Sequence, residues 1–296
     1  MEKAKVWFSA GLDSDTVVRL YDAVGRQLPG KVAVKVHSGE KGNINFLRPE
    51  FWKPVIDHVG GRVVETNTNY NGERNTTEKH RAVLEYHGWS HYFDVDIMDE
   101  DGELALPVKE PLQISENLVG RNLMNYDSML VLIHFKGHPR AGYGGALKQL
   151  SIGCASRNGK AVLHTGGIPG VKIWSPEAIA NQEAFQRAMA DAAYTVTEHF
   201  KDKLVYIAVM RNISVDCDCL AKAEPPCMKD IGILASLDPI ALDTACFDLI
   251  YAAKDDPGQQ HFLERVRSKN GDHLIDLALE HGFGTKEYEL IDTDKA

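Results

Sequence analysis

The chain has 296 residues, of which 44% are hydrophobic and 25% are charged, and its formal net charge is −9. This length and composition predict a globular protein of one large domain or two lobes, and they exclude extensive disorder. The acidic balance argues against a nucleic-acid partner, which needs a clustered basic surface. No apolar stretch approaches the roughly 20 residues of a membrane span.

Short apolar runs alternate with helical patterns, which predicts an α/β fold with a mostly parallel sheet and helices on both faces, in three layers. In chain order, we expect strands at residues 5–8, 31–36, 62–66, 128–135, 161–164 and 204–210. Helices are expected at residues 16–24, 49–58, 77–87, 146–152, 176–199, 239–253 and 259–269. We take residues 1–296 as a single domain, in which the acidic stretch 94–111 could be an excursion between two lobes.

The N-terminal residues and the cysteines bear on the cellular location of the protein. Residues 1–5 lead into a strand-like segment without the apolar region of a secretory signal, so we expect a cytoplasmic protein. Its five cysteines, an odd number, are not needed as disulfides in a cytoplasmic chain of this size. Metal binding or thiol chemistry is a better use for a cluster such as Cys217, Cys219 and Cys227.

The strongest functional signal is the Asp-Cys-Asp-Cys run at residues 216–219, after the strand expected at 204–210. In an extended backbone, residues two apart point to the same side with Cα atoms about 6.5 Å apart, so both thiols would face one way. Two thiolates on one face suit a soft metal or an iron–sulfur cluster. Cys227 could supply a third thiolate and Cys154 a fourth. The alternatives are a redox-active or catalytic thiol, and a pair of reduced cysteines in a loop.

A second candidate follows the buried strand expected at 128–135. If that strand continues, His134, Lys136 and His138 share one face at its C-terminal end, where open α/β sheets hold ligands. Two imidazoles and an ammonium group could bind a metal or an anion there, or move protons. The alternative is a solvated strand end with scattered polar side chains.

A third candidate is the glycine-rich loop of Gly142, Gly144 and Gly145, directly before the helix expected at 146–152. Glycines let a ligand approach the backbone, and the free N–H groups of a helix N-terminus attract anions. Lys148 adds positive charge in the first turn. The run is neither the dinucleotide fingerprint nor a phosphate-binding lysine loop, and a tight turn explains the glycines equally well.

Two further polar loops follow predicted strands. One begins at His37 and the other ends at Arg74. Several such loops on one sheet edge make a small-molecule site plausible, although each alone is more often simply a loop. The segment 9–14 looks like the pyrophosphate loop of ATP pyrophosphatases, but Ala10 departs from the glycine pair of that family.

Segments that appear in one order between residue 31 and about residue 248 carry a resemblance to a known family: KVHSGEKGN, NTNYNGER, HFKGHPRAGYGGALKQLSIGCASRNGK, and DCDC followed by DIGILASLDPIALD. They resemble the family named domain of unknown function 362. Because that family is sometimes joined to ferredoxin-type iron–sulfur modules, the resemblance implies iron–sulfur or redox work without revealing a reaction. The matched positions that it singles out are His134, Lys136, His138, Cys154, Cys217 and Cys219.

We therefore expect a protein that binds an iron–sulfur cluster or another metal through thiolates. Its expected function is that of a redox enzyme that acts on a small anionic molecule and exchanges electrons with a partner. The expected metal ligands are Cys154, Cys217, Cys219 and Cys227. The expected catalytic residues are His134, Lys136 and His138. Contacts to a cofactor or anion are expected from Gly142, Gly144, Gly145, Lys148, His37 and Arg74. Two alternatives remain: a small-molecule binding module without chemistry of its own, and a metal-dependent isomerase or hydrolase that uses His134 and His138 with Asp216 and Asp218.

Overall fold

The structure is a computed structural model that describes residues 3–168 and 172–295. In this part of the chain, a central eight-stranded sheet has the order β12-β1-β11-β10-β7-β2-β3-β4. The strands are β1 (Ala4–Ser9), β2 (Val32–Lys35), β3 (Arg62–Glu65), β4 (Asp96–Ile97), β7 (Ser128–His134), β10 (Leu204–Met210), β11 (Gly232–Ser236) and β12 (Tyr288–Asp292). All neighbours are parallel except for the pairs that β11 makes with β1 and β10. The predicted α/β fold with a mostly parallel sheet is confirmed.

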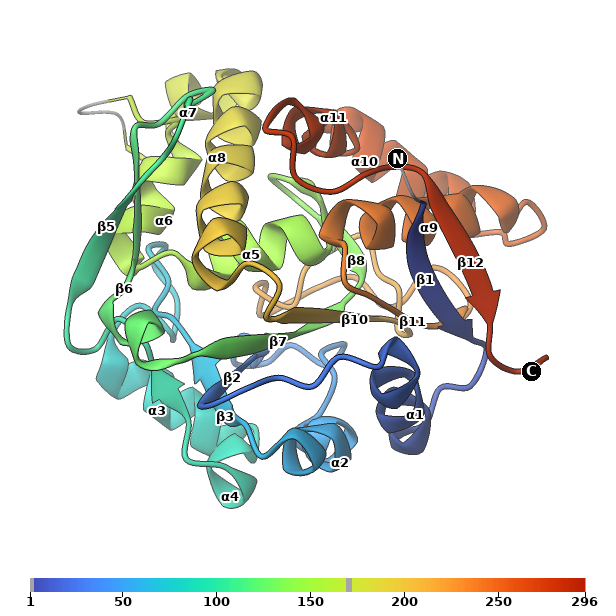
Figure 1. Cartoon of the computed structure of the whole chain (residues 1–296). Helices are drawn as coiled ribbons and strands as arrows, with labels where there is room; N and C mark the ends of the chain where they lie inside the picture. Colours follow the sequence, from blue (N-terminus) through green and yellow to red (C-terminus); the bar gives the residue numbers. More distant parts are fainter. Residues whose placement is uncertain (1–2, 169–171, 296) are drawn as a thin grey trace.

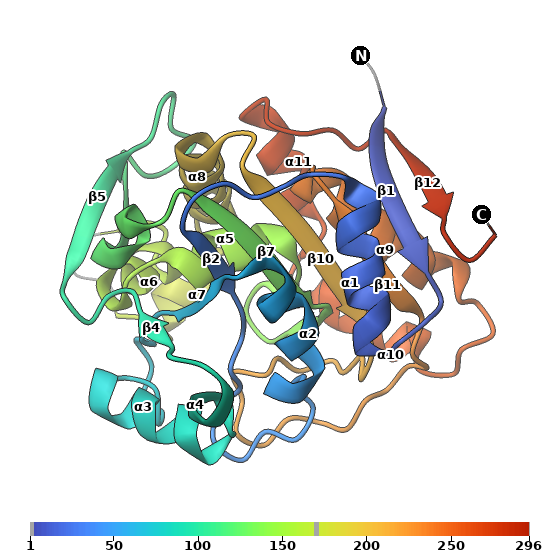
Figure 2. The same ribbon diagram turned by 60° about the horizontal axis from the view of Figure 1, so that its bottom comes forward.

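Helices cover both faces of the sheet, as Figure 1 and Figure 2 show. One layer contains α1 (Ser14–Val24), α2 (Pro49–Val59), α3 (Thr77–Tyr86) and α4 (Trp89–Tyr92). The other contains α5 (Ala146–Cys154), α6 (Arg157–His164), α7 (Pro176–Ala180), α8 (Gln182–Phe200), α9 (Pro239–Ala252), α10 (Gln259–Ser268) and α11 (His273–Glu280). A separate cluster of buried apolar side chains lies under each layer. The predicted three-layer arrangement is therefore present.

The central strands and their helices follow from local sequence. β7 and β10 are buried at all seven positions of each strand, because helices pack on both faces of parallel strands. α1 begins where the Asp13 carboxylate accepts the N–H of Thr16, at 2.7 Å. It ends at Gly25, whose φ of 70° is the left-handed conformation that glycine adopts without strain.

Two predicted elements differ in the structure. The strand expected at 161–164 is the second half of α6, which Ser156 caps by accepting the N–H of Gly159 at 2.9 Å. A short apolar run does not distinguish a strand from a helix by periodicity alone, which explains the error. The long helix expected at 176–199 is divided into α7 and α8, because Asn181 leaves the helical conformation with φ −86° and ψ 55°.

Two small sheets lie outside the central one. β5 (Glu103–Pro107) pairs with β6 (Glu116–Gly120), so part of the acidic stretch 94–111 forms a hairpin beside α6 and α8. After β7 the chain leaves the main sheet, and β8 (Lys136–His138) pairs with β9 (Gly142–Gly144). A 3-10 helix, η1 (Arg121–Asn125), precedes β7. Within the described residues, no helix is long and apolar enough to cross a membrane.

Candidate functional site

The candidate site lies at the edge of the sheet where four parallel strands end. β2, β3, β7 and β10 run in one direction, so the loops that follow them meet at one edge, the usual place for a ligand in an open α/β sheet. A cavity of about 270 Å³ opens there, between these loops and helices α5 and α6. Its lining includes His37, Arg74, His138, Lys148, Lys160 and Cys219.

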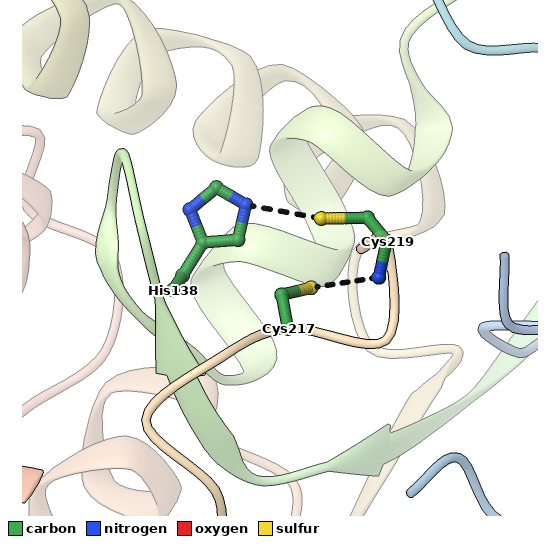
Figure 3. Close-up of side chains that lie close together, drawn as sticks. All are labelled: His138, Cys217 and Cys219. Atoms are coloured by element: carbon green, nitrogen blue, oxygen red, sulfur yellow. Dashed lines mark hydrogen bonds between the residues drawn. The ribbon is translucent and has the colours of Figure 1, made fainter. Parts of the chain in front are cut away.

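Figure 3 shows two thiols and an imidazole that point toward one another. Cys217 and Cys219 belong to the loop between β10 and β11, and His138 ends β8. Their three ligand atoms lie within 4.8 Å of one another, and no other histidines, cysteines or carboxylates of the described chain form such a group. The N–H of Cys219 donates to the Cys217 sulfur at 3.5 Å, and His138 Nε2 lies 3.6 Å from the Cys219 sulfur.

The hydrogen bonds of His138 determine which ring nitrogen carries its proton. Nδ1 accepts from the backbone N–H groups of Arg140, at 3.1 Å, and Ala141, at 2.8 Å. Burial lowers the pKa of His138 to about 4, so the ring is neutral near pH 7. A neutral ring whose Nδ1 accepts must carry the proton on Nε2. His138 therefore donates a hydrogen bond toward the sulfur atoms.

The pKa values of the two thiols are shifted in opposite directions. Burial alone raises the pKa of Cys217, but the hydrogen bond with Cys219 and the charge of Lys148 outweigh burial and hold this pKa well below its usual value. The same hydrogen bond, together with burial, raises the pKa of Cys219. Burial lowers the pKa of His37, an effect that the neighbouring Cys217 opposes. These shifts favour the thiolate, the nucleophilic and metal-binding form of cysteine, at Cys217 and the protonated thiol at Cys219.

Asp218 lies between the two cysteines and anchors their loop. Its carboxylate accepts from Lys136 Nζ at 2.9 Å and from His134 Nδ1 at 2.9 Å, and all three side chains are buried. Burial raises the pKa of Asp218, but the charges of His134 and Lys136 outweigh it and keep this pKa far below its usual range. His134 Nε2 contacts the carbonyl oxygen of Arg211 at 2.7 Å. With both ring nitrogens engaged, His134 holds the loop and has no nitrogen free for a metal.

Positive charges gather on the walls of the cavity. Lys35 Nζ is paired with Glu65 at 2.6 Å, and Arg74 Nε lies 3.4 Å from Glu40. Lys148 is also buried, yet no hydrogen bond or ion pair with another described residue satisfies its ammonium group. Because Lys148 lines the cavity, its positive charge is available to an anion bound there, beside the thiols on which it also acts.

The family named domain of unknown function 362 matches residues 32–248, a span that contains every residue of the site described above. The chain belongs to this family. No curated protein matches it.

Solved structures of two other proteins are distantly similar to this family member. The lactate racemase apoprotein from Thermoanaerobacterium thermosaccharolyticum is 12% identical, with a TM-score of 0.44, and the match covers 68% of this chain and 50% of that one. A protein from Thermotoga maritima is 12% identical, with a TM-score of 0.43, and the match covers 90% of this chain and 58% of that one. The chain therefore spans only 50% to 58% of the length of these two proteins.

In this domain of unknown function 362 protein, the helix N-terminus that follows the glycine loop is not free to bind an anion. The carboxylate of Asp243, from α9, accepts the N–H groups of Ala146 at 2.7 Å and Leu147 at 3.1 Å, so it already occupies the N-terminus of α5. A side chain on Gly145 would meet Asp243 Oδ1 at 2.4 Å, so this glycine makes room for Asp243. The other two glycines lie in β9 and are Gly142 and Gly144.

The structure does not bring the other two predicted thiolates to the metal group. Cys154 ends α5, where its thiol donates to the carbonyl oxygen of Gln149 at 3.7 Å, and burial raises its pKa to about 11. Cys227 lies farther along the loop, where its thiol donates to the carbonyl oxygen of Ile213 at 3.5 Å. Burial also raises the pKa of Cys227. Neither belongs to the group around Cys217. The predicted set of four thiolates is therefore not assembled in the described residues.

Three cavity residues were missed by reasoning from the sequence. Lys35 ends the otherwise apolar and buried strand β2, and Glu65 follows two buried valines at the end of β3. A charged residue in a buried strand indicates a buried ion pair, because an unpaired buried charge is strongly unfavourable. Lys160 carried no comparable signal, because it borders the segment that was expected to be a strand.

Proposed function

We propose that the protein is an enzyme that binds a soft metal ion through Cys217 and Cys219 and acts on a small anionic molecule in the adjoining cavity. The observation that carries this proposal is the position of the two thiols. Their sulfur atoms and His138 Nε2 lie within 4.8 Å of one another, and Cys219 and His138 line the cavity into which Lys148 also faces.

Ligand number favours a single ion over an iron–sulfur cluster. Ordinary clusters take four cysteine thiolates, whereas this site offers two thiols and one imidazole. Catalytic zinc sites use three protein ligands, in some enzymes two cysteines and one histidine, and leave the fourth position open for water or substrate. An ion held here would polarise a bound oxygen atom as a Lewis acid. The redox reaction and the electron-transfer partner expected from the family resemblance stay predictions.

The cavity itself supports a small, negatively charged substrate. Its volume of about 270 Å³ lies near the lower end of small-molecule pockets. The unpaired Lys148 would bind a carboxylate or a similar group beside the thiols. Reduced thiols also agree with the expected cytoplasmic location, since all five cysteines are free.

The proposal is tested by titrating the protein, purified without oxygen, with Co²⁺ and recording the thiolate-to-metal absorption. We expect one ion per chain, and loss of the band when Cys217 and Cys219 are both replaced by serine. Cys154→Ser is the matched control, because Cys154 is as buried as Cys217 but lies outside the group, and it should keep the band. Absence of the band from the unmodified protein, together with no bound metal on elemental analysis, would refute metal binding.

A second candidate is a thiol enzyme that needs no metal, and the hydrogen bonds of His138 favour it. A histidine that ligates a metal usually donates its other N–H to an oxygen atom, whereas Nδ1 of His138 accepts two N–H groups. The variant His138→Gln tests whether the ring is a ligand, because its amide can still donate to sulfur but is a poor metal ligand. Metal affinity should fall by about 10-fold or more if the ring ligates the ion, whereas unchanged affinity would leave His138 the role of a hydrogen-bond donor to the thiols. The metal-free enzyme is supported if the unmodified protein binds no Co²⁺.

A further inference from the structure

Lys160 is a buried amine on the wall of the cavity, and none of the roles above uses it. It lies in α6 and is 7% exposed. Its Nζ donates one hydrogen bond to Thr66 Oγ1 and another, of 2.8 Å, to the carbonyl oxygen of Ala155. Thr66 Oγ1 donates its own hydrogen to the carbonyl oxygen of Gly153 at 3.0 Å, so this hydroxyl is fixed as an acceptor for Lys160.

Among the described residues, no carboxylate forms a direct ion pair with Lys160, and Asp99 and Glu65 favour its charged form only from beyond ion-pair distance. Both of its acceptors are uncharged, and none of the ion pairs among the described residues includes it. Lys35 is the instructive contrast, because it is also buried but lies 2.6 Å from the Glu65 carboxylate. Burial lowers the pKa of Lys160 to about 7, an effect that Asp99 opposes and the charge of Lys35 strengthens. Near pH 7, a large fraction of Lys160 is therefore a neutral amine.

The geometry leaves this neutral amine able to react. A neutral primary amine has two hydrogens and one lone pair, and in Lys160 both hydrogens have acceptors in Thr66 and Ala155. The lone pair therefore remains free on a nitrogen at the cavity wall. A lysine that is desolvated and close to another cation is the kind of amine that enzymes use to attack carbonyl compounds.

We propose that Lys160 forms an imine with the carbonyl carbon of a small substrate whose carboxylate pairs with Lys148. The amine nitrogen attacks the carbonyl carbon and forms a C–N bond, and the carbonyl oxygen leaves as water with the two amine hydrogens. The substrate class is a carbonyl compound that carries a carboxylate, such as a 2-oxo acid. The inference rests on the anionic substrate of the proposed function but not on the metal.

The experiment traps the imine with pyruvate as the probe. Cyanoborohydride adds hydride to an imine, and the resulting secondary amine survives digestion and is located by peptide mass spectrometry. In the unmodified protein, we expect the label on Lys160 well before any exposed lysine, with a rate that rises through about pH 7. Labelling of Lys160 no faster than of the exposed lysines overturns the proposal, and this readout needs no variant that might fail to fold.

Three variants sharpen the result. Lys160→Arg keeps the positive charge but removes the nucleophile, and it should reduce trapping at least tenfold, whereas Lys109→Arg, at a side chain that is 76% exposed, should leave it unchanged. Lys148→Met should reduce trapping of pyruvate by about tenfold, as expected for the loss of a charge-assisted bond, but not that of uncharged acetone. Equal loss with both probes would overturn the carboxylate contact.

The two proposals fail independently. A protein that traps pyruvate but binds no Co²⁺ overturns the metal proposal alone. One that binds Co²⁺ but does not label Lys160 overturns the imine alone.

Discussion

Replacing Asp218 with asparagine tests whether a buried ion pair holds the thiol loop in place. The substitution keeps the shape of the side chain and removes its charge. In the native protein, the Asp218 carboxylate lies 2.9 Å from both Lys136 Nζ and His134 Nδ1, and the exposed fractions of the Asp218 and Lys136 side chains are 1% and 6%. The variant leaves the buried Lys136 ammonium without the carboxylate with which it pairs.

The expected cost is large because the remaining charge cannot reach water. Breaking a buried pair by removing one partner costs about 3–5 kcal/mol, against a total free energy of unfolding of about 5–15 kcal/mol for ordinary proteins. Urea unfolding at pH 7, followed by circular dichroism, should therefore show a much lower midpoint for Asp218→Asn. Because the folded-state pKa of Asp218 is depressed, its stabilisation is full above the unfolded pKa of about 3.9 and declines as pH falls below it. The difference between the two proteins should therefore narrow in acid.

A matched exposed pair provides the control. Arg62 and Asp94 lie 2.7 Å apart, but their side chains are 48% and 81% exposed. Because water screens such a pair, Asp94→Asn should change the free energy of unfolding by less than about 1 kcal/mol. If Asp218→Asn lowers the free energy of unfolding by no more than Asp94→Asn does, the buried pair does not stabilise the thiol loop more than an exposed pair would.

Three other predictions concern the same site. Lys148→Met should raise the apparent pKa for alkylation of Cys217 by about one unit or more, because the lysine charge stabilises the thiolate; an unchanged rate–pH profile with iodoacetamide would contradict this. Gly137→Ala should destabilise the fold by more than about 1 kcal/mol in urea unfolding, because the new Cβ would meet the backbone oxygen of Val215 at 2.2 Å; an unchanged midpoint would argue against this close approach. Cys154→Ser should leave iodoacetamide uptake by the native protein nearly unchanged, because burial raises the pKa of this thiol to about 11.

Local pattern was sufficient for the architecture and for the position of the site within it. The alternation of apolar strands with amphipathic helices predicted an α/β fold, because burial of a sheet on both faces imposes that pattern. Polar loops after parallel strands indicated one sheet edge, where the loops beginning at His37 and ending at Arg74 do meet. Cys217 and Cys219 come together because they are two residues apart in one loop. Where periodicity was ambiguous, as at residues 161–164, the prediction was wrong.

The sequence by itself thus determined the fold class, the edge of the sheet that carries the site and the pair of neighbouring thiols. Tertiary structure alone decided which donors and charges already have partners. Asp243, which lies 97 positions after Ala146 in the sequence, occupies the N-terminus of α5 that was expected to bind an anion. Asp218 engages His134, while Lys148 and Lys160 face the cavity without a carboxylate. Periodicity reports which face of an element is buried, but a partner from a distant element is determined only when the chain folds, because contact depends on distance in space and not along the sequence.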